Sequence, residues 1–203
     1  MGTARKILGI GIQRDRNAHK LKLSKSHYLN SVVKKFNMVD SKYVNVPLGG
    51  HFDLSSKQSP STKAEQERMS KVPFAEAIRS VMYSMICTRS DIAYSVSLLS
   101  RFMANPEEDH WKVLKWLLRY LKTTLKLGLL FKRVGRQTEL EGYVDADYAS
   151  NKDTRKSLTS YCFFVNECCI TWKSQMKQIV ALSTTKAEFI ATIKAFKEGV
   201  WMK

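Results

Sequence analysis

Two carboxylates in the last third of the chain, Asp145 and Glu188, are the residues whose types and placement could support chemistry. Asp145 ends a β-prone run that includes Tyr143-Val144, and Glu188 lies in the first turn of an expected helix. Cleavage of a phosphodiester by two metal ions needs several carboxylates around a pair of Mg²⁺ ions about 4 Å apart, and Mg²⁺ prefers oxygen ligands. A helix packed across a sheet could bring two such acids together. The pair therefore predicts half of a Mg²⁺-dependent nuclease site, with both residues as catalytic groups and metal ligands.

Each carboxylate also has a purely structural interpretation. With Thr185 as the N-cap, Glu188 would stand at the third helical position and complete a capping box. Asp145 could be an ordinary turn carboxylate, and Asp147 and Asp153 are further acids of the same segment that could be mistaken for ligands. Spacing alone leaves both interpretations open.

The charge of the chain is its strongest bulk property. The formal net charge is +16, and residues 1–138 contain 25 Lys and Arg against 10 Asp and Glu, whereas residues 139–203 contain 9 against 8. Such an excess predicts a polyanionic partner, either nucleic acid or an anionic membrane surface. No run reaches the ~18 apolar residues of a membrane span, and the N-terminal residues lack the apolar run of a secretion signal. We therefore expect an intracellular protein, in the cytoplasm or nucleus, with no membrane partner.

A basic stripe is expected on the helix that follows Asn105-Pro106, and we call it the helical stripe. Several phosphates neutralised by one helix would give salt-dependent, sequence-independent binding. An ordinary solvated helix face is the alternative, and the positive charge of residues 1–138 favours phosphate contact. The members of the stripe recur at helical spacing: Lys112, Lys115, Arg119 and Lys122.

Hydrophobic periodicity predicts an α+β fold. Ser24 and Ser90 are expected to cap two of the helices, and the last helix is expected to bury an apolar face formed by Phe189, Ile193, Phe196 and Val200. The expected organisation is a hairpin and helix in residues 1–38, an exposed connection in 39–73, basic helices in 74–138, and three strands followed by one helix in 139–203.

Short sequence motifs along nearly the whole chain resemble the Pol polyprotein of copia-type retrotransposons, from the end of the reverse transcriptase into the ribonuclease H domain. The motifs occur in the same order as in that family, and together they are far more specific than any one of them. They include Lys6-Ile7-Leu8-Gly9, Arg14-Asp15-Arg16, Phe36-Asn37-Met38, Asp91-Ile92-Ala93-Tyr94, Ser100-Arg101-Phe102-Met103, His110-Trp111, Asp145-Ala146-Asp147-Tyr148-Ala149, Ala181-Leu182-Ser183-Thr184-Thr185 and Ala187-Glu188.

The resemblance implies that residues 1–38 end the polymerase palm, that residues 74–138 form the thumb and connection region, and that residues 139–203 begin a ribonuclease H-like α/β domain with three strands and its first helix. It implies Mg²⁺ as the cofactor, held by Asp145 and Glu188, and an RNA–DNA hybrid as the partner. The Tyr-x-Asp-Asp motif of the polymerase would lie upstream of Met1, and the next ribonuclease acid beyond Lys203. We therefore expect a Pol fragment that catalyses neither reaction on its own.

Two alternatives remain beside this expectation. The chain could be a non-catalytic nucleic-acid-binding module that uses its basic helices. It could also be the product of a decaying element, because Arg79, Ser90 and Thr123 stand where the family usually has Gly, Pro and Gly. An incomplete ribonuclease H sheet would leave strand edges uncovered, which favours self-association.

Overall fold

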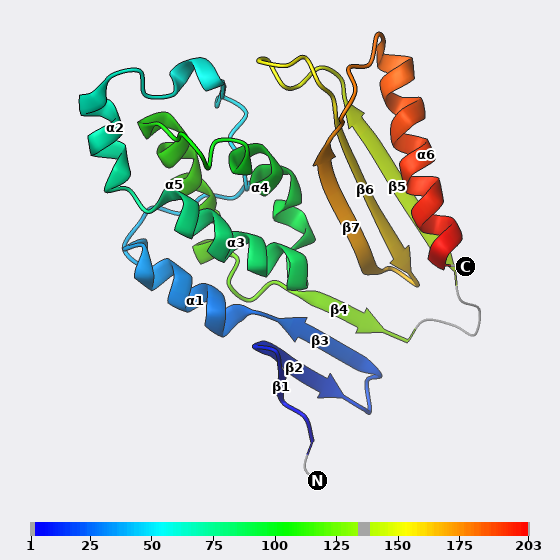
Figure 1. Ribbon diagram of the computed structural model, residues 1–203. Helices are drawn as coiled ribbons and strands as arrows, with labels where there is room; N and C mark the ends of the chain where they lie inside the picture. Colours follow the sequence, from blue (N-terminus) through cyan, green and yellow to red (C-terminus); the bar gives the residue numbers. More distant parts are fainter. Residues whose placement is uncertain (1–2, 134–138, 203) are drawn as a thin grey trace. The chain divides into compact units, whose positions relative to one another are not determined.

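The computed structural model describes residues 3–133 and 139–202, and within them the chain has the expected α+β composition (Figure 1). The chain divides into two compact units, one made of residues 1–13 and 22–128 and the other of residues 14–21 and 129–203. We expected a domain boundary between residues 138 and 139, and residues 134–138 lie outside the described part. The two units divide earlier in the chain, between Gly128 and Leu129. Among the described residues no helix combines the length and hydropathy of a membrane span.

A four-stranded sheet has the order β1-β2-β3-β4 and contains the expected hairpin. The antiparallel turn between the first two strands uses positive φ angles at Leu8 (47°) and Gly9 (74°), and glycine adopts such angles without steric cost. The strands are β1 (Lys6–Ile7), β2 (Ile10–Asp15), β3 (Lys20–Ser24) and β4 (Leu129–Lys132).

A buried lysine, Lys25, stabilises the turn between β1 and β2. The ammonium group of Lys25 donates to the Leu8 carbonyl oxygen at 3.1 Å and lies 3.4 Å from the centroid of the Tyr83 ring. The Tyr83 hydroxyl donates to the same carbonyl at 3.0 Å. Lys25 is also the N-cap residue of helix α1, and its side chain makes no capping bond, so the cap expected from Ser24 is wrong.

Gly128 allows β4 to approach β3. A Cβ atom at this position would lie 2.2 Å from the carbonyl oxygen of Leu23, which is closer than non-bonded atoms can approach. Any side chain here would therefore separate the backbones of the two strands.

The hydrophobic core of the first unit lies among its helices. Helix α3 contributes Phe74, Ile78 and Val81 at helical spacing, and helix α5 contributes Leu114, Leu118 and Leu121, all fully buried. The helices are α1 (Ser26–Lys35), α2 (Lys63–Ser70), α3 (Phe74–Thr88), α4 (Ala93–Ser100) and α5 (Glu108–Thr123), with short 3-10 turns η1 (Ser56–Gln58) and η2 (Ser90–Ile92).

The segment 39–73, expected as an exposed connection, is more ordered than its composition indicates. Helix α2 begins at a capping box in which the Thr62 hydroxyl accepts from the Glu65 N–H and the Glu65 carboxylate accepts from the Thr62 N–H. The segment also buries Val44, Leu54 and Met69. Isolated apolar residues in a polar sequence have no periodicity, so only tertiary packing shows where they lie.

The second unit contains a three-stranded antiparallel sheet in the order β5-β6-β7, with helix α6 packed chiefly against β5 (Figure 1). The strands β5 (Leu140–Asp147), β6 (Leu158–Val165) and β7 (Cys168–Met176) match the expected strands, and α6 spans Thr184–Met202. The self-association expected through the edges of this sheet stays a prediction.

The buried face of α6 differs from the expected one. Ala187, Ala191 and Ala195 are buried, whereas Phe189 and Phe196 are 64% and 70% exposed. Ile193 and Val200 are exposed as well. Helical periodicity predicts that the face with the larger apolar side chains is buried. In the structure α6 lies close to β5 and β6, and the face with the small alanine side chains is buried against them.

Candidate functional site

Asp145 is exposed near the end of β5, where the strand pairing defines its neighbours. It pairs with Ser160 of β6, and Ser160 pairs with Ser174 of β7. The Ser160 hydroxyl donates to the Ser174 hydroxyl at 3.1 Å. Because directly paired residues of antiparallel strands share one face of the sheet, Asp145 begins a polar row that crosses all three strands.

Glu188 is the fifth residue of α6, not a residue of its first turn. The helix is capped by Ser183, whose hydroxyl oxygen accepts a hydrogen bond from the Lys186 N–H at 3.1 Å. The third helical position is therefore Lys186, and Thr185 lies inside the helix. The capping box proposed for Thr185 and Glu188 is wrong, and the exposed Glu188 carboxylate has no part in capping.

A buried lysine, Lys177, approaches the same helix. Its ammonium group donates to the carbonyl oxygen of Ala187, the residue before Glu188. Burial lowers the pKa of Lys177, and the negative charge of Glu188 opposes this effect. The structure therefore places a cation within the electrostatic field of Glu188. Nothing in the sequence distinguishes Lys177 from the exposed lysines.

The two predicted ligands lie on neighbouring elements, because α6 packs against β5. Within residues 3–133 and 139–202, however, no group of three or more His, Cys, Asp or Glu side chains is arranged to hold a metal ion. A role of Asp145 and Glu188 as Mg²⁺ ligands therefore stays a prediction.

Two members of the helical stripe, Lys112 and Lys122, are less available to a ligand than their helical spacing suggests. Lys112 pairs with Asp109 at 2.9 Å and with Glu108 at 3.8 Å. Lys122 donates to the carbonyl oxygen of Ser41 at 2.7 Å. These two cations are thus engaged within the protein.

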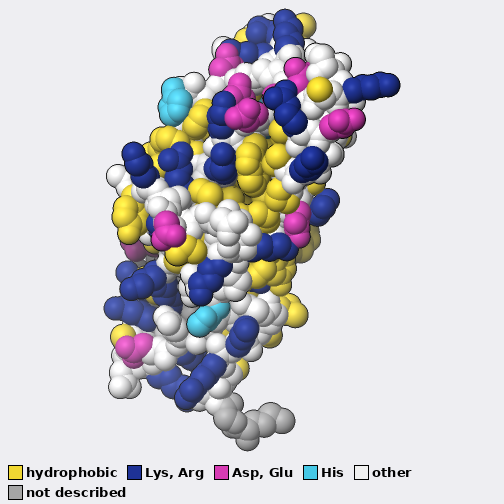
Figure 2. Space-filling view, turned by 90° about the vertical axis from the view of Figure 1, so that its left-hand side faces the viewer, with side chains coloured by type: hydrophobic (Ala, Val, Ile, Leu, Met, Phe, Trp, Pro, Cys, Tyr) yellow, Lys and Arg dark blue, Asp and Glu magenta, His cyan; other side chains and the backbone are white. Residues whose placement is uncertain are grey.

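The two central members of the stripe lie beside tryptophan rings. The Lys115 ammonium is 6.0 Å from the centroid of Trp111, and the Arg119 guanidinium is 4.9 Å from that of Trp116. On the face shown in Figure 2, Lys and Arg side chains are scattered rather than gathered in one patch.

A second basic surface was not expected from the sequence, and we call it the hairpin groove. It is a hollow of about 680 Å³ between the tip of the β2–β3 hairpin and the end of β4. Phe131 lines it, and no ion pair among the described residues involves its cations. The exposed cations are Arg14, Arg16, Lys20, Lys132 and Arg133.

The backbone of the hairpin tip explains why these cations converge. The Asp15 carboxylate accepts from the Ala18 N–H at 2.9 Å, so the acid of this turn is used to hold the turn. The Arg133 N–H donates to the His19 carbonyl oxygen at 3.2 Å and joins the tip to the end of β4. The sequence shows two short basic segments, Arg14-Asp15-Arg16 and Lys132-Arg133, that are far apart along the chain. The pairing of the strands brings them together.

The sequence is similar to polyproteins of transposons. It is 46% identical over 203 residues, all of this chain, to the retrovirus-related Pol polyprotein from transposon TNT 1-94 of Nicotiana tabacum. It is 31% identical over 196 residues, 95% of this chain, to the retrovirus-related Pol polyprotein from transposon RE1 of Arabidopsis thaliana. The chain spans 15% and 13% of the length of these two proteins.

A shorter protein is also similar to the chain. The secreted RxLR effector protein 161 of Plasmopara viticola is 42% identical over 134 residues, which are 66% of this chain and 94% of that protein. No family model matches the chain, and no solved structure matches it.

Proposed function

We propose that the chain, which is similar over almost its whole length to retrovirus-related Pol polyproteins from transposons, is the part of a copia-type Pol that joins the reverse transcriptase to ribonuclease H. In this proposal the chain binds RNA–DNA hybrid through the hairpin groove and does not cleave it unaided. The observation that carries the binding function is the convergence of five exposed cations around one hollow.

The charge of the groove supports phosphate binding. Among the described residues that line it, five are cations and one, Asp15, is an acid that already accepts a backbone hydrogen bond. Cations that neutralise phosphates release condensed counterions, so the logarithm of the binding constant falls with the logarithm of salt by about 0.9 per phosphate. Five contacts predict a slope of about −4.5, or a loss of several hundred-fold in affinity on a roughly fourfold increase in salt.

The helical stripe supports the same proposal less strongly. Lys112 and Lys122 would have to leave Asp109 and the Ser41 carbonyl before they could bind phosphate. Lys115 and Arg119 remain the better placed members for contact with a strand.

The residues around Glu188 support the absence of cleavage by these 203 residues alone. In-line attack on a phosphodiester uses two metal ions held by several acids, and Asp145 and Glu188 are two. Lys177 also supplies positive charge near Glu188, which weakens the electrostatic demand for Mg²⁺ at that carboxylate.

Charge reversal tests the binding function. The variant Arg14→Glu, Arg16→Glu should bind a labelled RNA–DNA hybrid more weakly, and its salt slope should be shallower by about two. Binding is measured by fluorescence anisotropy over a range of salt concentrations. The matched control is Lys57→Glu, Lys63→Glu, which makes the same change in net charge at exposed positions of η1 and α2. Equal losses in both variants would refute the role of the hairpin groove.

A cleavage assay tests the second part of the proposal. The purified chain should leave a labelled hybrid intact in Mg²⁺, and so should Asp145→Asn. Cleavage by the wild-type chain that disappears in Asp145→Asn would overturn the claim of inactivity and identify Asp145 as a catalytic residue.

A further inference from the structure

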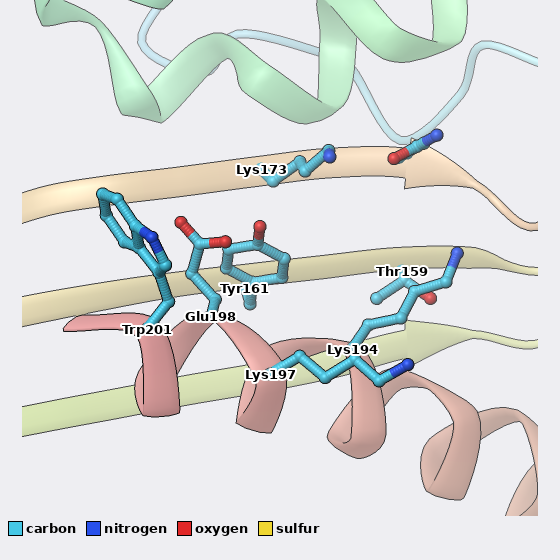
Figure 3. Close-up of a pocket in the computed structure, with 8 residues that line it drawn as sticks. Thr159, Tyr161, Lys173, Lys194, Lys197, Glu198 and Trp201 are labelled. Carbon is cyan, nitrogen blue, oxygen red and sulfur yellow. The ribbon is translucent and has the colours of Figure 1, made fainter. Parts of the chain in front are cut away.

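A second hollow lies within the second unit, between α6 and the strands β6 and β7, and we call it the sheet groove (Figure 3). Its volume is about 400 Å³. Tyr161 of β6 forms its floor, Lys173 of β7 lies on one side, and the last turns of α6 form the other. Because Tyr161 pairs with Val144, whose side chain alternates with that of Asp145 along β5, this hollow opens on the sheet face opposite to Asp145.

Three lysines give the sheet groove a positive charge. They are Lys173, Lys194 and Lys197, and no ion pair formed among the described residues involves them. Glu198, the acid among the described residues that line the groove, accepts from the Thr171 hydroxyl at 3.5 Å. Burial raises the pKa of Tyr161, and so do the charge of the neighbouring Glu198 and its hydrogen bond with the Tyr161 hydroxyl. The groove therefore keeps an excess of two positive charges.

An aromatic ring stands at the other end of the groove. Trp201 is 82% exposed, and it lies four residues after Lys197 on the same side of α6. Figure 3 shows Lys194 and Lys197 extending along the groove toward Thr159, away from the indole. The groove thus separates an apolar π surface from a cluster of ammonium groups along its length.

We propose that the sheet groove binds one nucleotide unit of a single-stranded nucleic acid, with the base stacked on Trp201 and the phosphate held by Lys194, Lys197 and Lys173. Stacking on an exposed aromatic ring is tolerant of sequence, because every base presents a π face, and cations beside the ring follow the backbone. A base-paired duplex hides these faces, so the groove selects an unpaired strand. This site is separate from the hairpin groove and does not depend on hybrid binding there.

The test uses the full chain, a short labelled oligothymidylate and anisotropy measurements. Trp201→Ala should weaken binding by about 5- to 150-fold, which corresponds to the 1–3 kcal/mol typical of one stacked base. The matched aromatic control is Phe196→Ala, which removes an exposed ring of α6 outside the groove and should leave the affinity unchanged. Equal affinity in the wild-type chain and Trp201→Ala would overturn the proposal.

The lysines have their own control on the same helix. Lys194→Gln with Lys197→Gln should weaken binding and reduce the salt slope by about 0.7 at most, because the two lysines hold one phosphate, whereas Lys186→Gln, exposed near the start of α6, should change neither. Circular dichroism establishes that each variant is folded.

Competition experiments separate this site from the alternatives. Arg14→Glu, Arg16→Glu should keep its affinity for oligothymidylate while losing affinity for hybrid, which distinguishes a failure of this proposal from a failure at the hairpin groove. Unlabelled duplex DNA of the same length should compete more weakly than unlabelled oligothymidylate, and equal competition would overturn the assignment to an unpaired strand. Competition by polyglutamate as strong as that by oligothymidylate would show that bases are not recognised and would also overturn it.

Discussion

The guanidinium group of Arg89 binds the carboxylate of Asp91 through two hydrogen bonds, from Nε to Oδ1 at 2.8 Å and from Nη2 to Oδ2 at 2.7 Å. Arg89 is 1% exposed, and it also donates to the carbonyl and hydroxyl oxygens of Thr124 at 3.1 and 2.7 Å. The Tyr120 hydroxyl donates to Asp91 at 2.8 Å. This network joins the end of α3 to the end of α5. The helix cap expected from Ser90 is wrong, because Ser90 is the first residue of η2 and the N-cap residue of α4 is Ile92.

Removal of the guanidinium should be strongly destabilising, because it takes away the charged partner of the Asp91 carboxylate and the donor to the two Thr124 oxygens. Arg89→Met should lower the free energy of unfolding by about 3 kcal/mol, the low end of the range for a broken buried ion pair, since Asp91 is a third exposed. Urea unfolding followed by far-UV circular dichroism measures the change. Arg79→Met, at an exposed position of α3, should change stability by less than about 0.5 kcal/mol. Similar losses in both variants would contradict the role of the network.

Acid should weaken the same network. Burial acts to raise the pKa of Asp91, but the hydrogen bonds and charge of Arg89 and the Tyr120 hydroxyl outweigh it and hold this pKa below the ordinary 3.8. A lowered pKa in the folded state means that the stabilisation is fully present above pH 3.8 and is lost as the pH falls through the folded value. The stability difference between the wild-type chain and Asp91→Asn should therefore shrink between neutral pH and pH 3. A constant difference across this range would contradict the assignment.

The cap of α6 can be tested by two neighbouring substitutions. Ser183→Ala should lower stability by about 1 kcal/mol, because the Lys186 N–H loses its acceptor. Thr185→Ala should have almost no destabilising effect, because Thr185 is inside the helix. Hydrogen exchange at the first amides of α6 gives a local measurement of both effects. The reverse order of effects would restore the capping box of Thr185 and Glu188.

Gly128 links the packing of β4 to the hairpin groove. Gly128→Ala places a Cβ against the Leu23 carbonyl oxygen, so the strands β3 and β4 must move apart. We expect weaker hybrid binding as well as lower stability, because Lys132 is the last residue of β4 and Arg133 follows it directly. Gly50→Ala is the control, since a Cβ there meets no atom within 4 Å. Unchanged hybrid binding by a folded Gly128→Ala chain would show that β4 does not position the groove.

Much of the secondary structure follows from local patterns in the chain. Strands β5, β6 and β7 and helices α1, α3 and α5 appear where alternation or helical periodicity predicts them, because each has one face whose burial is repeated along the sequence. Periodicity does not predict helix α2, although Thr62 and Glu65 are the residue types of its capping box. It has one buried apolar residue, Met69, so its periodicity is weak.

The sequence alone determined the acidic residues worth testing, the concentration of positive charge in residues 1–138 and the resemblance to transposon polyproteins. Tertiary structure decided which cations are available, because Lys112 and Lys122 find partners within the protein, whereas no ion pair in the described part of the chain involves the cations of the hairpin groove. It also turned the alanines of α6 inward and left its large apolar side chains in solvent. The physical reason is the same in each case. Residue type and residue spacing are local properties of the sequence, whereas the burial of a side chain and its bonding partner depend on the helix or strand that packs against it.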